Sequence, residues 1–219
     1  MTAPLPADLP EADPLSAVVW PVRTDRLVLR PATPADLEPT WRYRRLDEVR
    51  AWISTAPTDP EVYRAQFLDP QRLARTLVIE LAEGEGSGPV VIGDIMLRVE
   101  DAWAQTEVQE AARATQAELG WSLDPAYGGH GYATEAVRAT VDLCFGPLGL
   151  RRVHAGCFGD NTPSWRLMER IGMRREEHST ATALHRSGVW MDGMNYALLA
   201  PEWPEEAAAR AASGAVGSH

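Results

Sequence analysis

The chain has 219 residues, of which 45% are hydrophobic and 24% are charged, and its formal net charge at pH 7 is −10. This length and composition favour one soluble globular domain, and no apolar run approaches the roughly 18 residues of a membrane span. The acidic balance argues against a general nucleic-acid binder and weakly favours cationic or amine-bearing partners, so neither a nucleic acid nor a membrane is expected as a partner.

Both ends of the chain are expected to be flexible tails. Residues 1–22 are Pro-rich and acidic and residues 204–219 are Ala-rich, without an apolar face to bury, which leaves 23–203 as the domain. The start, MTAPLPADLPEADP, has no basic stretch before an apolar region, so we expect no export signal and a cytoplasmic protein. Cys144 and Cys157 are too few for a disulfide framework and lack metal spacing, so we expect buried apolar side chains and no metal site.

The first half of the domain predicts a strand, two helices and a β-hairpin. RLVLRP at 26–31 is strand-like, and TPAD at 33–36 supplies an N-cap, a proline and an acid, so a helix should begin at Pro34. DPE at 59–61 repeats this signal and predicts a helix to about Leu73. TLVIELA and VVIGDIMLRV then predict two antiparallel strands around EGEGSGP.

A long polar connection at 101–117 leads to a strand with one polar face. The connection is Ala- and Gln-rich and longer than a normal hairpin turn, so we interpret it as an insertion or flap. The next segment, ELGWSLD, alternates in polarity and ends at Pro125. Its apolar face carries Leu119, Trp121 and Leu123, and its polar face carries Glu118, Gly120, Ser122 and Asp124.

The second half predicts a strand, glycine loop and helix followed by further strands. After YGGHGY, the segment ATEAVRATVDLCF has a helical period that stops at GP, residues 146–147. RRVHAGCF at 151–158 is strand-like, Thr162 and Pro163 open a short helix, and Gly172 stands at a left-handed C-terminal cap. Two more strands are expected, the last within 189–199. The order predicts an α/β mixed sheet with helices on both faces.

The glycine-rich loop at 128–133 is the most informative stretch. Glycines let the backbone approach a ligand, and the start of the following helix adds positive partial charge, so the loop suits a pyrophosphate. A tight turn without a ligand is the alternative. The chain has no lysine and so no P-loop, and Thr134 stands where a Rossmann fingerprint requires a third glycine.

The segment PAYGGHGYATEA resembles the acetyl-CoA loop of GNAT-superfamily acetyltransferases. Asn161-Thr162-Pro163-Ser164 and Gly172-Met173 resemble the Asn-x-x-Ser and Gly-Phe/Met signatures of that superfamily at the family's spacing. With RLVLRPATPADL and GVWMDGMNYALL, the resemblance covers most of residues 24–200 and leans toward the RimJ/RimL-type branch of ribosomal-protein N-terminal acetyltransferases. It implies an acyl-CoA N-acyltransferase fold, with a mostly antiparallel sheet splayed at the cofactor site.

The resemblance also implies which residues bind acetyl-CoA. It puts the pantetheine and the thioester carbonyl against the backbone of Leu123 and the far arm of the cofactor near Asn161. The family's Gln or Arg at the head of the loop is a glycine here, so one side chain that assists the pyrophosphate is absent. The loop residues assigned to the cofactor are Gly128, Gly129, His130, Gly131, Tyr132 and Ala133.

Two residues are candidates for proton transfer. Glu118 lies on the polar face of the strand that ends at the loop, and we assign it as general base acting through water; a solvated strand glutamate is the alternative. The superfamily's tyrosine acid is Met168 here, so Ser164 is the substitute, unless it only bonds amides at the helix start. His130 is assigned to the variable loop position, and Trp41, Trp52 and Trp165 are expected in the core or the pocket wall.

The resulting functional hypothesis is an N-acetyltransferase that acts on a primary amine, with a protein or peptide N-terminal α-amine as the first choice. A small-amine enzyme acting on an aminoglycoside or polyamine is the alternative within enzymes, and an acetyl-CoA-binding module without catalysis is the alternative outside them. We expect the 101–117 segment to flank the acceptor site. The sequence leaves a monomer and a homodimer both open.

Overall fold

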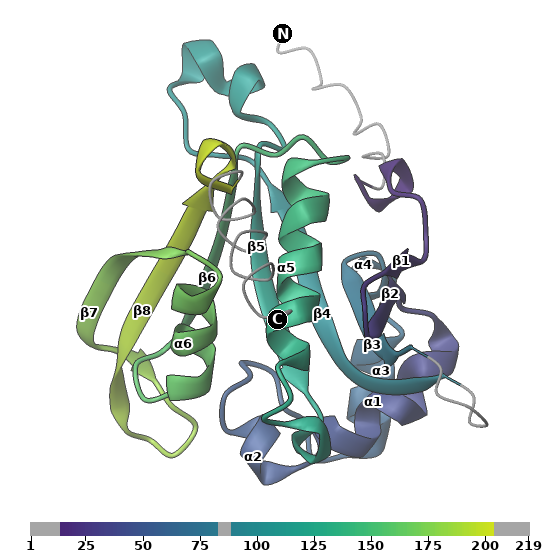
Figure 1. Ribbon diagram of the computed structural model, residues 1–219. Helices are drawn as coiled ribbons and strands as arrows, with labels where there is room; N and C mark the ends of the chain where they lie inside the picture. Colours follow the sequence, from purple (N-terminus) through teal and green to yellow (C-terminus); the bar gives the residue numbers. More distant parts are fainter. Residues whose placement is uncertain (1–13, 83–88, 204–219) are drawn as a thin grey trace, which may run out of the picture.

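A computed structural model describes residues 14–82 and 89–203. The described residues form one sheet with the strand order β1-β2-β3-β4-β5-β6-β8-β7, and Figure 1 shows helices packed against it. The expected tail at 204–219, the first part of the expected leader and most of the β3–β4 turn lie outside the described residues. No helix in the described part is both long and apolar enough to cross a membrane.

The elements follow the chain in this order. The strands are β1 Val22–Arg23, β2 Leu27–Pro31, β3 Thr76–Leu81, β4 Val90–Glu100, β5 Gln116–Leu123, β6 Arg152–Phe158, β7 Arg174–Leu184 and β8 Trp190–Leu199. The α-helices are α1 Leu37–Arg44, α2 Asp47–Arg50, α3 Pro60–Phe67, α4 Pro70–Leu73, α5 Tyr132–Phe145 and α6 Thr162–Arg170. Short 3-10 helices are η1 Pro14–Ala17, η2 Pro34–Asp36, η3 Thr106–Ala112, η4 Pro125–Tyr127 and η5 Ala200–Glu202.

The sheet is mostly antiparallel, as the sequence predicts. Among the described strands, β5 and β6 form the one parallel pair, and every other neighbouring pair is antiparallel. The parallel pair arises because α5 connects the two strands as a crossover. The mixed sheet with helices on both faces confirms the predicted fold class.

Two cores hold helices on the two faces of the sheet. The larger core joins the strands to α5 and α6, with Val137 and Met168 fully buried. The smaller core packs α1 and α3 on the opposite face through Tyr43 and Phe67, and Trp41 stacks on Tyr63 beside it, with ring centroids 4.8 Å apart. The sheet therefore separates an α5 face from an α1–α3 face, and the candidate site lies where strands of this sheet diverge.

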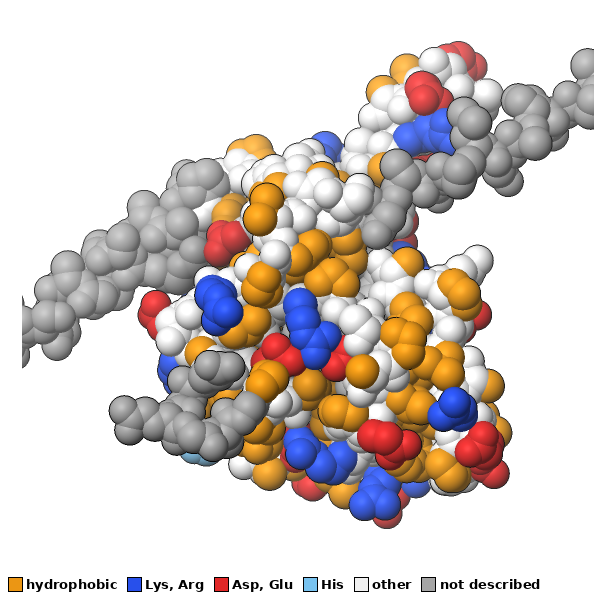
Figure 2. Space-filling model, turned by 90° about the vertical axis from the view of Figure 1, so that its right-hand side faces the viewer, with side chains coloured by type: hydrophobic (Ala, Val, Ile, Leu, Met, Phe, Trp, Pro, Cys, Tyr) orange, Lys and Arg blue, Asp and Glu red, His pale blue; other side chains and the backbone are white. Residues whose placement is uncertain are grey.

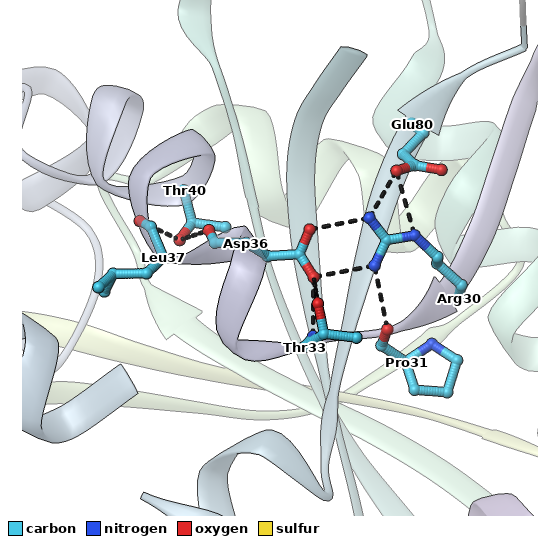
Figure 3. Close-up of polar contacts among 7 residues, drawn as sticks. All are labelled: Arg30, Pro31, Thr33, Asp36, Leu37, Thr40 and Glu80. Carbon is cyan, nitrogen blue, oxygen red and sulfur yellow. Dashed lines mark hydrogen bonds and ion pairs between the residues drawn. The ribbon is translucent and has the colours of Figure 1, made fainter. Parts of the chain in front are cut away.

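An ion-pair network fixes the start of α1 on the sheet (Figure 3). Arg30 of β2 donates to both oxygens of Asp36, at 2.8 Å each, and to Glu80 of β3 at 2.6 Å. Asp36 also accepts from the N–H group and the hydroxyl of Thr33, as the predicted start signal implies. Burial alone would raise the pKa of Asp36, but the hydrogen bonds from Arg30 and Thr33 hold it below its ordinary value. This network sets the direction of α1 across the sheet.

The edge of the molecule beside β1 and β2 has a mixed surface. Figure 2 shows arginines and acidic side chains interspersed among hydrophobic ones on this face. The edge strand β1 is only two residues long. A short edge with charges around it disfavours pairing with a strand of another chain.

Several boundaries differ from the sequence predictions. The helix expected to begin at Pro34 begins there as the 3-10 helix η2, and α1 starts at Leu37. The helix expected to run from Pro60 to Leu73 is two helices, because Asp69 caps a new start and Pro70 has no N–H to continue the old helix. The folded part begins before residue 23, since Leu15 is buried in the larger core. The last two residues of the 101–117 connection belong to β5.

Candidate active site

The loop between β5 and α5 presents a row of backbone N–H groups without protein acceptors. Gly129 and Gly131 have φ angles of 78° and 80°, in the left-handed region that favours glycine, and Gly131 caps the start of α5. Within the described ranges, the N–H groups of residues 129–133 donate no hydrogen bond to the protein. Since they lie at the positive end of a helix dipole, they suit a diphosphate. The geometry fits the expected cofactor, and the assignment of each loop residue stays a prediction.

An arginine and a glutamate that the sequence analysis does not single out hold this loop. Arg26 donates from Nη1 to the His130 carbonyl oxygen at 2.9 Å, and its guanidinium lies 4.7 Å from the centroid of the Tyr132 ring. Arg26 Nη2 pairs with Glu135 Oε2 at 2.6 Å, and Thr24 donates to Glu135 Oε1 at 2.6 Å. Burial alone would raise the pKa of Glu135, but the hydrogen bonds from Thr24 and Arg26 outweigh burial and lower it. Residues 26 and 135 are 109 positions apart, so no local signal links them.

The two strands that lead to the site separate along the cleft. β5 and β6 pair only between Gln116–Glu118 and Arg152–His154, although β5 continues to Leu123. The Asp124 N–H group donates to the Ile92 carbonyl oxygen at 2.7 Å, so these two residues form a hydrogen-bonded pair of the β4–β5 ladder. The adjacent pair, Leu123 and Gly93, is then a non-hydrogen-bonded pair. The backbone groups of Leu123 therefore point away from β4, into the gap. This unpaired edge fits the expected binding of pantetheine and of a thioester carbonyl, which stays a prediction.

The gap opens into a cleft of about 2110 Å³. Single ligand pockets usually have volumes of roughly 300–1,000 Å³, so this cleft has room for a large cofactor and an acceptor together. One part is lined by the loop from Gly128 to Glu135 and by α6, and another part by residues 51–55 and 183–186. The cleft thus reaches elements on both faces of the sheet.

Glu118 lines the cleft on the face opposite α5, as its place in the strand predicts. Leu119 packs in the core that contains α5, so its neighbour Glu118 points to the other face. The Glu118 side chain is 30% exposed, and its Oε2 forms an ion pair with Arg98 of β4. In the described part of the chain, Oε1 has no protein partner. One carboxylate oxygen is therefore available to water or an acceptor, and the role as base stays a prediction.

Asn161 and Ser164 lie together at the start of α6, and both line the cleft. Asn161 is buried, and its Oδ1 accepts a hydrogen bond from the Ser164 N–H group at 3.3 Å, so its side chain caps α6. No hydrogen bond of the Ser164 hydroxyl to another described residue is formed, which leaves it available to a ligand. Met168 is fully buried and offers no proton.

Cys157 is a cleft residue to which the sequence analysis gives no chemistry. It lies on β6, and burial raises the pKa of its thiol to about 11. A thiol with this pKa is protonated near neutral pH and is a poor nucleophile. We therefore assign Cys157 no role as a nucleophile. Cys144 is buried in the larger core, as expected.

An aromatic cluster closes the cleft beside the β7–β8 hairpin. Trp52 lies 6.4 Å from Phe158 and 6.0 Å from His185, measured between ring centroids. His185 Nε2 lies 2.8 Å from the Ala51 carbonyl oxygen, and Arg186 donates to the Ile53 carbonyl oxygen. Trp52 is thus a pocket-wall residue, one of the two places expected for it. These contacts tie the hairpin to the segment after α2, and only the fold brings them together.

The 101–117 connection lies away from the cleft, contrary to the expectation that it flanks the acceptor site. It precedes β5 and contains η3, whereas the glycine loop follows the other end of β5 (Figure 1). The cleft lining on β5 begins at Glu118. A strand carries its two connections at opposite ends, so the segment before β5 and the loop after it are separated by the length of the strand.

The chain matches the family model described as an acetyltransferase (GNAT) domain over residues 26–174. A segment of 86 residues is 40% identical to the uncharacterized N-acetyltransferase YnaD of Bacillus subtilis and covers 39% of this chain and 50% of that protein. Over 84 residues, the chain is also 38% identical to the probable N-acetyltransferase YjcK of the same species, and this match covers 38% of this chain and 46% of that protein. The chain spans about half the length of the curated relatives it matches.

Solved structures show the same fold. A GNAT-family acetyltransferase from Bacillus anthracis has a TM-score of 0.68 and 30% identity, over 83% of this chain and 99% of that one. RimJ of Mycobacterium smegmatis, solved in complex with CoA-disulfide, has a TM-score of 0.65 and 24% identity, over 86% and 89% of the two chains. The family model covers well over half of the sequence, and the chain therefore belongs to the GNAT acetyltransferase domain family.

Proposed function

We propose that this chain transfers an acetyl group from acetyl-CoA to a primary amine. The observation that supports this most directly is the unbonded row of N–H groups at 129–133, next to the strand edge that β6 leaves open. A diphosphate needs the first feature and an extended pantetheine arm with amide groups needs the second. The GNAT fold generally binds acetyl-CoA, and RimJ of Mycobacterium smegmatis was solved with a CoA derivative.

Three residues of the cleft have separate roles in the proposed reaction. When bound, acetyl-CoA supplies the acetyl group as an activated thioester. The backbone of Leu123 orients the carbonyl at the open edge of β5, and Glu118 takes the proton that the amine loses, through water. Ser164, with its unbonded hydroxyl at the start of α6, donates a hydrogen bond to the leaving thiolate and relays a proton to it from water, so that the serine hydroxyl is regenerated. A coenzyme thiol is comparable to cysteine, with a pKa of about 8.5, so a strong acid is unnecessary.

We further propose an N-terminal α-amine as the acceptor and a cytoplasmic site of action, as in the RimJ/RimL-type branch that the sequence resembles. An α-amine has a pKa of about 7.7 to 8.0, whereas a lysine ε-amine has a pKa of about 10.4. The two pKa values differ by about 2.5 units, so deprotonating an N-terminal amine costs roughly 3.4 kcal/mol less than deprotonating a lysine side chain. The base need not supply this free energy for an N-terminus. A cleft with one well-placed glutamate oxygen suits the easier acceptor.

A thiol-release assay with acetyl-CoA and an amine panel tests the proposal. The panel contains N-terminal peptides, a peptide with a blocked N-terminus and a free lysine, a polyamine and an aminoglycoside. We expect thiol release and a mass gain of one acetyl group with the free N-terminal peptides. Faster transfer to the ε-amine or to the polyamine would overturn the acceptor assignment. Tight acetyl-CoA binding by calorimetry without any transfer would favour the binding module instead.

A further inference from the structure

The half of the cleft opposite α5 contains two arginines without a carboxylate partner. Arg72 lies near the end of α4 and Arg75 just before β3, and both line the cleft. Considering only residues 14–82 and 89–203, neither guanidinium forms an ion pair or a hydrogen bond with a side chain. Arginines that line a cavity without partners are well suited to binding carboxylate or phosphate groups.

The sheet register places the start of β3, next to these arginines, two strands from the strand that carries Glu118. Thr76, Met96 and Gly120 are cross-strand partners on β3, β4 and β5, and all three line the cleft. Partners in an antiparallel register share a face, and this face also carries Glu118, two residues before Gly120. Arg75 lies in the turn directly before Thr76 and lines the cleft, and the start of β3 is separated from β5 by two strand spacings, or about 10 Å. An acceptor held beside Glu118 is within reach of a long arginine side chain that enters the cleft from the start of β3.

The charge around Arg72 is unbalanced. The nearby Asp94 is already occupied, since it accepts from the Tyr43 hydroxyl at 2.6 Å and pairs with Arg44. Burial, and after it the positive charge of Arg44, lowers the pKa of Arg72. Glu48 also lines this part of the cleft but is exposed to solvent. An added anion would therefore be stabilised here, although the chain as a whole is acidic.

Arg72 is also held in a fixed orientation. Its guanidinium lies 5.5 Å from the centroid of the Tyr63 ring and 5.7 Å from that of Phe67, and both rings belong to the smaller core. The carbonyl oxygen of Arg72 accepts from the Thr76 hydroxyl at 2.7 Å, which joins the end of α4 to β3. A guanidinium stacked on aromatic rings loses little freedom when it binds a ligand.

We propose that Arg72 and Arg75 bind a carboxylate that the acceptor carries close to its reacting amine. This proposal rests on the proposed acetyl transfer and narrows its acceptor to acidic amines. The carboxylate comes either from an acidic side chain at the start of a peptide or from the α-carboxylate of a free amino acid. A polyamine, which carries only positive charge, is disfavoured in the same place because it meets the unpaired guanidinium groups.

Matched acceptor pairs test the proposal. One pair is a C-terminally amidated peptide that begins with Asp and the same peptide beginning with Asn; the other pair is a free amino acid and its amide. We expect the wild type to have a kcat/KM about tenfold higher for the acid than for its neutral partner in at least one pair. A factor of this size is what a hydrogen bond to a charged group usually contributes. The pair that shows the preference identifies the source of the carboxylate.

Charge-removing variants connect this preference to the two arginines. Arg75→Gln and Arg72→Gln should each raise the KM of the acidic acceptor roughly tenfold, leave the neutral acceptor within twofold, and leave acetyl-CoA affinity unchanged. Arg64→Gln on the exposed face of α3 removes the same charge outside the cleft and should change nothing. Because Arg72 packs on two core rings, Arg75→Gln carries the test if Arg72→Gln fails to fold.

A binding measurement separates this proposal from the proposed activity. The CoA-loaded protein is titrated with N-acetyl-Asp and N-acetyl-Asn peptides, and with N-acetyl derivatives of the free amino acid and its amide. Tighter binding of an acidic product, lost in Arg75→Gln, supports the site even if no amine panel reveals turnover. Equal binding of acid and neutral products overturns the arginine site. Transfer to amines with no acid preference would likewise overturn it while leaving acetyl transfer intact.

Discussion

The two halves of the cleft are built in different ways. The half that we assign to the cofactor is mainly one continuous stretch, from the end of β5 through the glycine loop into α5, with α6 beside it, and the binding groups proposed in that stretch are backbone amides. The acceptor half takes side chains from many separate places, among them α1, α4, the start of β3, the segment after α2, β5 and the β7–β8 hairpin. A backbone site depends on glycine conformation and helix start, whereas a side-chain site depends on which distant elements the fold brings together.

Because the two halves are built differently, substitutions in them should affect cofactor binding and acceptor binding differently. Changing a side chain in the cofactor half should disturb cofactor binding little unless it changes φ, blocks the amides or loosens the contacts that hold the loop. Changing one in the acceptor half alters the groups that contact the acceptor, with no effect on the amides. Acceptor specificity can therefore change while cofactor binding stays the same, and the following predictions test that separation.

The largest effect is expected for Gly131→Val. Gly131 has a φ of 80°, which a β-branched residue adopts only at a cost of about 1–3 kcal/mol, and its new Cβ lies 3.6 Å from Nη2 of Arg26, so we expect the substitution to distort the loop and obstruct a diphosphate bound to its amides. Acetyl-CoA affinity measured by calorimetry should fall by about 100-fold or more. Gly149→Val is the control, because Gly149 also has a positive φ, 60°, but is exposed outside the cleft. Unchanged affinity in a folded Gly131→Val protein would move the cofactor site elsewhere.

The next effect is expected for Glu118→Gln, which keeps the shape of the side chain but removes the proposed base. We expect kcat to fall by on the order of 10²-fold with acetyl-CoA affinity nearly unchanged. Raising the pH above about 8 should partly restore kcat, since solvent then deprotonates an α-amine. Glu107→Gln in the 101–117 connection is the control. If Glu118→Gln keeps full kcat from pH 6 to 9, the base lies elsewhere.

A smaller effect is expected for Glu135→Gln, which loosens the contact of Arg26 with the loop. Acetyl-CoA should bind about tenfold less tightly, because the loop amides lose part of their fixed arrangement. The exposed Glu38→Gln on α1 should leave the affinity unchanged. Wild-type affinity in Glu135→Gln would show that Arg26 holds the loop without this partner.

The ion pair of Arg26 and Glu135 also predicts that the stability of the fold depends on pH. The pKa of Glu135 is lowered in the folded state, so its stabilising contribution is complete above the ordinary carboxyl value of about 4.3. That contribution is lost as the pH falls through the lower, folded-state pKa. Thermal unfolding of wild type and Glu135→Gln should therefore differ most above pH 4.3 and converge at more acidic pH. A difference that grows on acidification would contradict the lowered pKa.

The smallest effect is expected from the 101–117 connection. Replacing residues 102–114 with a short Gly/Ser turn should leave both the acceptor KM and the acetyl-CoA affinity within about twofold, because the segment precedes β5 at the end away from the loop. Kinetics with the best acceptor and calorimetry with acetyl-CoA measure the two quantities. A clear rise in acceptor KM would mean that this segment reaches the acceptor after all.

The sequence by itself predicted most of the elements, including the strand, glycine loop and helix to which we assign the cofactor. Start signals such as TPAD at 33–36 and the helical period of α5 are local, so the strand, the loop and the helix around the glycines could be predicted in order. The resemblance to the GNAT superfamily rests on the same contiguous segments, and the family model confirms it over residues 26–174. Local conformation and local motifs are properties of short stretches, which is why the sequence could specify them.

Only the tertiary structure decided what meets across the cleft. Arg26 meets Glu135 over 109 positions, and the hairpin residue His185 contacts Ala51, 134 positions away. The arginines at 72 and 75 share a cavity with Glu118 because β3, β4 and β5 are neighbours in register. Such contacts follow from strand order and from the divergence of β5 and β6. Both depend on the packing of the whole sheet, and no short segment of the chain encodes them.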